Sequence, residues 1–188
     1  MLDDLLTGLW WGENVVWTCA ERDDVHGLAG ALLAGMGRAP VFGRVLLLSG
    51  PDGVALASDR PGHVARFAPA GPDGGDPASL TARLAGELGE ARAALVVDVA
   101  GWPHADRAEG VRELSGLARW ALAQRAVVIW LVPATGEFDA VRGALSEFAQ
   151  CGLSMRDRRI RVEKAEGARR TCAERCCPTR WTRTGGSR

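Results

Sequence analysis

The chain has 188 residues, of which 47% are hydrophobic, and its formal net charge at pH 7 is zero. This length suits a single folded domain, and this share of apolar residues excludes a generally disordered protein. No apolar run approaches the roughly 20 residues that a membrane-spanning helix needs, and Asp3 and Asp4 interrupt the first leucines. We therefore expect neither a membrane segment nor a secretory leader, and a cytoplasmic location.

The zero net charge conceals two oppositely charged regions. Residues 156–188 hold 11 Lys and Arg but only 4 Asp and Glu, whereas residues 1–155 hold 12 and 19. This asymmetry predicts an acidic domain followed by a basic tail. Because hydrophobic periodicity ends near residue 165, we place the domain at residues 1–165 and a disordered, Cys- and Arg-rich tail at residues 166–188. Two origins stay open for this tail: a functional segment, or a shifted reading frame in GC-rich DNA.

The predicted elements begin with a strand and a helix. Residues 14–19, NVVWTC, are a short apolar run that is typical of a strand buried on both faces. A helix follows over residues 23–37, where apolar residues recur at helical spacing. We expect one of its two leading aspartates to cap it, and Gly27 and Gly30 to bring it close to the sheet.

Strands and helices then alternate up to residue 165. Continuous apolar runs predict further buried strands, at 44–50, 93–101 and 126–135. Shorter segments predict edge strands, at 63–67 and 158–165. Apolar stripes predict helices in three places, namely from Asp76-Pro77 onward, at 107–125 and at 137–150. Such alternation indicates a three-layer α/β domain with a mostly parallel sheet and helices on both faces.

Three segments of the chain carry a family resemblance: LDDLLTGLWWGENVVW, ALVVDVAG and AVVIWLVPAT. Together they resemble the core of the RecA/KaiC-like ATPase superfamily. The phrase GENVVW at residues 12–17 is similar to one in the degenerate KaiC-like domain that precedes some phosphoenolpyruvate-synthase-type proteins. The resemblance covers residues 1–165 and implies a RecA-like, P-loop NTPase-like sheet.

The resemblance also implies a phosphate loop, which this sequence lacks. Active members carry G-x-x-x-x-G-K-[ST] after the first strand, and its N–H groups and lysine hold the phosphates. Here AERDDVHG follows Cys19, and Lys164 is the one lysine of the chain. Glu21, Asp23 and Asp24 place negative charge where the phosphates would lie. Two like charges about 4 Å apart repel by roughly 1 to 4 kcal/mol, so these residues oppose triphosphate binding.

The other two motifs of the family are represented by one residue. Ser49 and Gly50 end the second predicted strand, where the family usually has a catalytic glutamate. Asp98, in LVVDVAG, matches the aspartate that the family associates with magnesium, and we interpret it as a vestigial Walker B-like residue. A capping or turn role explains Asp98 equally well. The resemblance thus implies a pseudo-ATPase with no catalytic residue, cofactor or metal.

Within the predicted domain, three tryptophans stand apart from every predicted stripe and buried strand: Trp10, Trp11 and Trp102. Trp10 and Trp11 are adjacent, so on an extended segment their side chains point in opposite directions. Either one of them meets a partner, as tryptophan does at interface hot spots, or both line a groove of the chain itself. Trp102 follows a predicted parallel strand at its carboxyl end, where open α/β sheets place their binding crevices.

Histidine and cysteine give no clear site. The histidines, at positions 26, 63 and 104, lie on three different predicted elements without a nucleophile motif, so we interpret them as surface residues. The tail cysteines, at positions 172, 176 and 177, lack the second ligand pair that structural zinc requires. Reactive thiols flanked by arginines are the alternative for the tail.

We therefore expect a non-catalytic, degenerate ATPase-like module that acts by binding a protein or an effector, in a regulatory role. One alternative is a nucleotide-binding protein with an unorthodox site at the carboxyl edge of the sheet, with Asp98 near the ligand. Another is nucleic-acid binding through the basic tail, which the acidic residues 1–155 disfavour. We expect a protein partner rather than a membrane, and an oligomer stays open.

Overall fold

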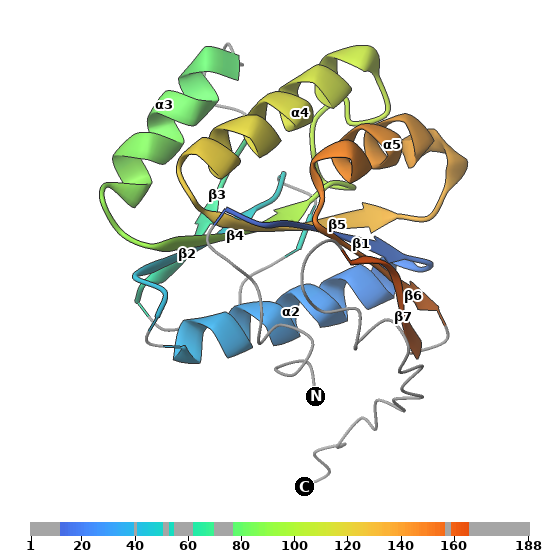
Figure 1. Ribbon diagram of the computed structural model, residues 1–188, viewed down its shortest axis with the longest axis horizontal. Helices are drawn as coiled ribbons and strands as arrows, with labels where there is room; N and C mark the ends of the chain where they lie inside the picture. The colour runs from blue at the N-terminus through green and yellow to red at the C-terminus, as the bar shows by residue number, and fades with distance from the viewer. Residues whose placement is uncertain are drawn as a thin grey trace, which may run out of the picture.

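The described residues of the computed structural model form a seven-stranded sheet in the order β3-β2-β4-β5-β1-β6-β7 (Figure 1). These residues are 12–39, 41–50, 53–54, 62–69, 77–156 and 159–165. The strands are β1 (Asn14–Cys19), β2 (Arg44–Leu48), β3 (Val64–Phe67), β4 (Ala93–Asp98), β5 (Val127–Pro133), β6 (Cys151–Arg156) and β7 (Arg159–Ala165). Neighbouring strands are parallel except for β6 and β7.

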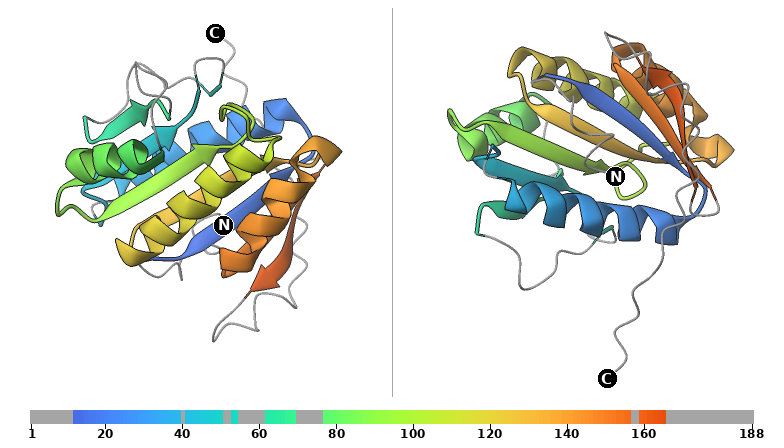
Figure 2. Two further views of the ribbon diagram at one scale, coloured as in Figure 1. Left: turned by 90° about the horizontal axis from the view of Figure 1, so that it is seen from above. Right: turned by 60° about the horizontal axis from the view of Figure 1, so that its bottom comes forward.

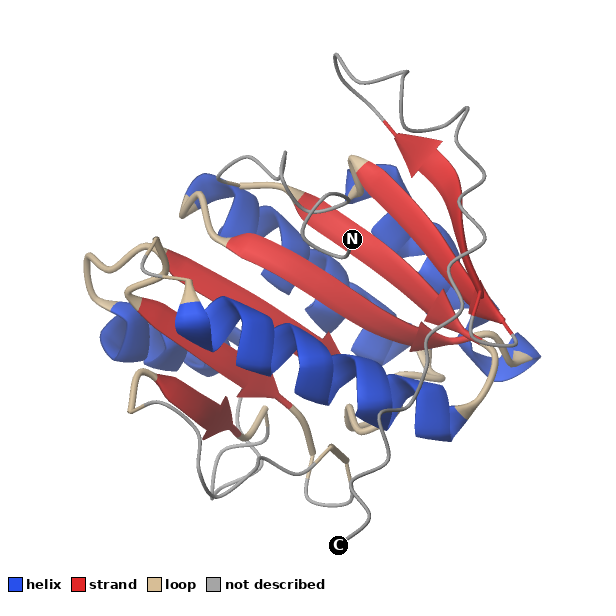
Figure 3. Cartoon of the chain, turned by 90° about the horizontal axis from the view of Figure 1, so that it is seen from below, coloured by secondary structure: helices blue, strands red, loops and turns tan. Residues whose placement is uncertain are grey.

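Helices cover both faces of this sheet. The helices α3 (Pro77–Leu88), α4 (Ala108–Ala123) and α5 (Asp139–Phe148) lie on one face, and a short 3₁₀ turn, η1 (Gly136–Phe138), leads into α5. The helix α2 (Arg22–Arg38) crosses the opposite face, as Figures 2 and 3 show from above and below. The predicted three-layer α/β fold with a mostly parallel sheet and helices on both faces is confirmed. No helix among the described residues is long and apolar enough to cross a membrane.

The alternating side chains of the strands build two hydrophobic cores, one on each face. On β5, Trp130 packs toward α3, α4 and α5, whereas its neighbours Ile129 and Leu131 pack toward α2. All six residues of β4 are buried, because it is covered on both faces. Burial on both faces explains why the central strands are continuously apolar in sequence.

The helix α2 differs from its sequence-based prediction in two ways. It begins at Arg22, with Glu21 in the N-cap position and no side-chain cap, because the helix follows β1 almost directly. Gly27 and Gly30 do not face the sheet: both are exposed, and a Cβ added to either would meet nothing within 4 Å. The residues that face the sheet are instead Val25, Leu28, Ala29, Leu32, Leu33 and Met36.

Smaller differences concern β6 and α4. The strand β6, CGLSMR, was not predicted, because it shows neither a continuous apolar run nor a clean alternation. It forms because β1 and β7 pair with it on its two sides. Leu122, which is apolar like the residues of the stripe that predicts this helix, is 46% exposed. The edge strands β3 and β7 are confirmed, and each ends the sheet.

Candidate functional site

The connection between β1 and α2 occupies the place where the resemblance implies a phosphate loop. It consists of two residues, Ala20 and Glu21, which we call the short connection. The Ala20 N–H donates a hydrogen bond to the Met155 carbonyl at 3.1 Å. The carbonyl of the preceding residue, Cys19, accepts one from the Ala134 N–H at 2.8 Å. A connection of two residues, tied to strands on both sides, has no room for a loop that wraps a phosphate.

Cys19 ends β1 beside the short connection, and its thiol is not a nucleophile. The side chain is fully buried, and burial, followed by the charge of Asp24, raises the pKa of this thiol from 9.0 to about 12. The thiolate, which is the reactive form, is therefore not populated at neutral pH.

Asp98 ends β4 at the same edge of the sheet, with only β5 between it and β1. Its carboxylate is 2% exposed. One oxygen, Oδ2, accepts hydrogen bonds from Ser49 Oγ at 2.9 Å and from the Val54 N–H at 3.0 Å. The other, Oδ1, accepts one from the Gly101 N–H at 3.3 Å. Asp98 thus holds the segment after β2 against the segment after β4.

Glycines make this contact possible. A Cβ on Gly50 would lie 1.9 Å from the Gly101 carbonyl oxygen, and a Cβ on Gly53 would lie 1.9 Å from Ser49 Oγ and 2.4 Å from Asp98 Oδ2. No side chain fits at either position. We call these five residues (Ser49, Gly50, Gly53, Asp98 and Gly101) the glycine clasp. Within the described residues, no group of three His, Cys, Asp or Glu could hold a metal ion there or elsewhere.

Trp102, which the sequence placed where open α/β sheets have their binding crevices, lies in the hydrophobic core. The turn after β4, in which the Trp102 N–H bonds the Val99 carbonyl, folds the indole back beneath α4. The indole is 4% exposed, and its Nε1–H donates a hydrogen bond to Glu113 Oε2 at 2.9 Å. Trp102 is therefore a core residue that holds Glu113 in place. Trp10, Trp11 and the tail, residues 166–188, lie outside the described residues.

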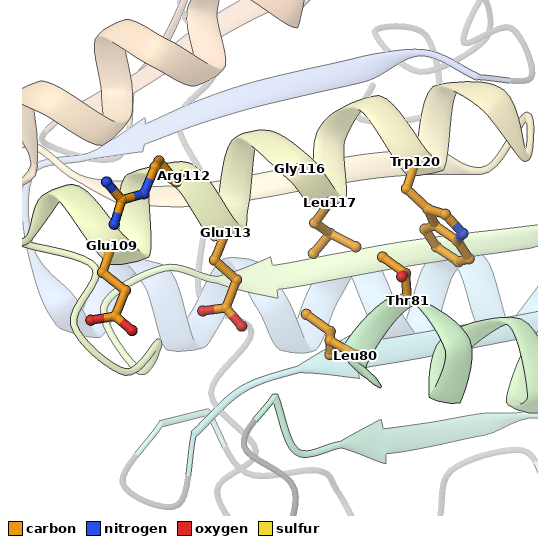
Figure 4. Close-up of a pocket in the computed structure, with 8 residues that line it drawn as sticks. All are labelled: Leu80, Thr81, Glu109, Arg112, Glu113, Gly116, Leu117 and Trp120. Carbon is orange, nitrogen blue, oxygen red and sulfur yellow. The ribbon is translucent and has the colours of Figure 1, made fainter. Parts of the chain in front are cut away.

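A groove that the sequence did not reveal runs between α3 and α4 (Figure 4). Its volume is about 500 Å³. Leu80 and Leu117 lie at its base, and the stripe of α4 that faces it carries Glu109, Glu113, Gly116 and Trp120. We call this cavity the α3–α4 groove. It combines carboxylates at one end with an aromatic wall at the other.

Comparison with known proteins supports the fold and no more. No family model and no curated protein matches the chain. Among solved structures, the chain is similar to a protein of Pyrococcus horikoshii OT3, with a TM-score of 0.56 and 9% sequence identity. The likeness covers 87% of this chain and 91% of the other. At such low identity it shows a shared α/β fold alone.

Proposed function

We propose that this chain is a non-catalytic, degenerate ATPase-like module that acts by binding a protein or an effector in a regulatory role. The observation that carries the proposal is the short connection. A phosphate-binding site at a helix N-terminus needs free backbone N–H groups that point at the ligand. Here the Ala20 N–H is bonded to the Met155 carbonyl, and only two residues separate the end of the strand from the start of the helix.

Electrostatics at the start of α2 also argues against a nucleotide. A helix N-terminus carries the equivalent of about half a positive charge. Glu21, in the N-cap position, and Asp24, in the first turn, bring two negative charges to the same place. Arg22 offsets one of the three acids at positions 21, 23 and 24, so the formal charge of this segment stays negative, and the one lysine of the sequence is at position 164. Magnesium triphosphate would meet repulsion where active relatives provide attraction.

The environment of Asp98 supports a structural role for this residue. Both carboxylate oxygens accept hydrogen bonds from the protein, and Gly53 and Gly101 approach so closely that a ligand would have to displace them. The alternative of a nucleotide at this edge needs the clasp to open. The alternative of nucleic-acid binding concerns residues 166–188, which the structure does not describe.

Calorimetry and a phosphate-release assay with Mg²⁺-ATP test the proposal. We expect no dissociation constant below the millimolar range and no turnover above the rate without protein. Asp98→Asn is the matched variant, because its amide oxygen still accepts a hydrogen bond in the clasp while the charge is removed. Micromolar binding by the wild-type chain, together with turnover that Asp98→Asn abolishes, would refute a non-catalytic module.

A further inference from the structure

We propose that two copies of this chain associate through β7, with the two strands paired antiparallel about a twofold axis. The strand β7 (Arg159–Ala165) ends the seven-stranded sheet, as Figure 1 shows, and β6 pairs with one side of it. No strand of the described residues pairs with its other side. An edge strand presents backbone N–H and C=O groups with which another strand can pair. This self-association goes beyond the proposed function and does not depend on it.

One face of β7 is apolar and lacks a covering helix. Ile160 and Val162 pack against the core on the α2 side of the sheet, beside Met155 of β6, and all three stay partly exposed. The helix α2 packs against β1, β2, β4 and β5. Figure 3 shows no described helix over β6 and β7 on this face. A second copy that extends the sheet at β7 would bring its own Ile160 and Val162 beside these residues and bury more apolar area.

The other face of β7 is charged. Arg159, Arg161 and Glu163 are exposed there, and Glu163 Oε1 accepts a hydrogen bond from Ser154 Oγ of β6 at 2.7 Å. Within the described part of the chain, no ion pair joins these three residues to another side chain. Charged edge strands commonly resist pairing, because like charges then come to lie opposite each other. The order of the charges in β7 has the reverse consequence when the second strand is a copy of β7 itself.

The residues of β7 are complementary to themselves when Arg161 lies on the twofold axis. In an antiparallel pair, directly opposed residues share a face of the sheet. Arg159 then lies opposite Glu163 of the second copy, and Ile160 lies opposite Val162 of the second copy. Each contact occurs twice, because the interface is symmetric. Arg161 opposes its own copy once, and this repulsion is smaller than the gain from two opposite-charge pairs and two apolar pairs.

The neighbouring registers are less favourable. With Ile160 on the axis, Arg159 lies opposite Arg161 of the second copy, so two like-charge contacts form. With Val162 on the axis, Ile160 lies opposite Lys164. The Lys164 side chain is directed to the other face, where its Nζ donates a hydrogen bond to a carbonyl of α5 at 3.1 Å, so it does not pack against Ile160. A shift by one residue is excluded, because it would oppose residues of different faces.

The charges next to β7 also favour a carboxylate from a second copy. On β6, Arg156 lies directly opposite Arg159, and both side chains are exposed. Two like charges in opposed positions destabilise a strand pair. Glu163 of a second copy would place a carboxylate beside these two guanidinium groups, and charge-assisted hydrogen bonds to arginine are among the stronger ones.

The contact is small, so we expect a reversible dimer that dissociates on dilution. Residues 159–163 of each copy take part, far fewer than the roughly 20 to 30 residues a side of a standard interface. Sedimentation equilibrium of the full-length chain between about 1 and 200 µM measures the dissociation constant. A reductant in the buffer excludes dimers that are linked by disulfides.

Two charge reversals test the register. Arg159→Glu and Glu163→Arg each place like charges opposite each other twice, so each variant alone should dimerise at least about tenfold more weakly than the wild type. An equimolar mixture of the two variants restores opposite charges at both contacts, so the heterodimer should form about as tightly as the wild-type dimer. Glu90→Arg, in the turn between α3 and β4, is a reversal of the same size away from β7 and should have no effect.

Three outcomes would overturn the proposal. The first is a chain that sediments as a monomer even at about 200 µM. The second is a dimer that neither charge reversal weakens, because such a dimer uses another surface. The third is a mixture that dimerises no better than its two components, because the two charged positions would then not face each other. Unfolding of one variant does not imitate the expected result, since a misfolded chain is not rescued by the other variant.

Discussion

Two connections at the carboxyl edge of the same sheet have opposite constructions. The short connection after β1 has two residues, and its backbone is hydrogen-bonded to the neighbouring strands. The connection between β4 and α4 has nine residues, 99–107, and it contributes Gly101 to the glycine clasp and Trp102 to the core beneath α4. Open α/β sheets bind ligands at this edge. The two connections therefore fill the usual position of a ligand in two different ways.

The two connections differ in what fixes their backbone. The short connection closes the phosphate position with ordinary strand pairing and acidic residues. The longer connection is rigid because a buried carboxylate and close-packed glycines hold it, and it supports α4, whose exposed stripe lines the α3–α4 groove.

Removal of the Asp98 carboxylate should have the largest effect on the clasp. In Asp98→Ala, Ser49 Oγ, the Val54 N–H and the Gly101 N–H lose their buried acceptor. We expect the free energy of unfolding to fall by about 3 kcal/mol, because hydrogen bonds to a charged group contribute more than neutral ones and the donors stay buried. Urea denaturation measures this change. A loss below about 0.5 kcal/mol would mean that Asp98 does not hold the two segments together.

A methyl group at Gly50 should break the same contact from the other side. Gly50→Ala puts a Cβ 1.9 Å from the Gly101 carbonyl oxygen, and backbone must move to relieve this overlap. We expect a loss of about 2 kcal/mol, in the range for overpacked sites. Gly86→Ala, on α3, is the matched control, since a Cβ there meets nothing within 4 Å. Equal stability of the two variants would contradict close packing in the clasp.

The sequence predicted the elements well, because most of them are governed by local patterns. Burial on both faces makes β1, β4 and β5 continuously apolar, and their predicted positions agree with the structure within a few residues. The absence of a phosphate loop was also readable, since a missing lysine needs no structure to be seen. The turn role suggested for Asp98 agrees with the hydrogen bonds of the clasp.

The features that the sequence did not predict depend on how helices and strands pack against one another. Glu109, Glu113 and Trp120 share one stripe of a predicted helix, but the pattern does not say that α3 begins partway along α4 and leaves a groove. The indole of Trp102 was expected beside a binding crevice at the end of its strand, and only the fold of its turn brings it beneath α4. The strand β6 similarly follows from its two neighbours rather than from its own residues.

High pH should lower the free energy of unfolding through the buried thiol of Cys19, which lies beside the short connection. The pKa of the folded thiol is about 12 against 9.0 for an ordinary thiol, so above pH 9 the unfolded chain releases a proton that the folded chain retains. Stability that is complete below pH 9 is therefore lost as pH rises toward 12. Between pH 8 and pH 10 we expect Cys19 to contribute a loss of about 1 kcal/mol, since one pKa unit corresponds to about 1.4 kcal/mol.

Urea denaturation of the wild type and of Cys19→Ala at both pH values measures this contribution. The variant lacks the thiol, so its free energy of unfolding should fall less between the two pH values. Equal slopes for the two proteins would mean that Cys19 is accessible to water, and the end of β1 would then be open rather than closed.

The smallest effect is expected at three glycines of α2, of which Gly27 and Gly30 are exposed and Gly35 is half-buried. Gly27, Gly30 and Gly35 have no atom within 4 Å of an added Cβ, in contrast to Gly50 and Gly53. Alanine at an exposed helical position stabilises relative to glycine by up to about 1 kcal/mol, because glycine loses more backbone entropy on folding. Gly30→Ala should therefore raise the melting temperature by about 2 to 4 °C in a domain of this size.

The sign of this change separates two accounts of α2. If Gly30 brought the helix close to the sheet, as the sequence suggested, alanine would push the two apart and lower the melting temperature. If Gly30 faces outward, alanine raises the melting temperature. The glycines of α2 and those of the glycine clasp then have different roles. Those of the clasp are required by contact distances, whereas those of α2 can be replaced without loss. Calorimetric scans measure the melting temperatures of Gly27→Ala, Gly30→Ala, Gly35→Ala and Gly53→Ala. We expect the first three to rise and that of Gly53→Ala to fall.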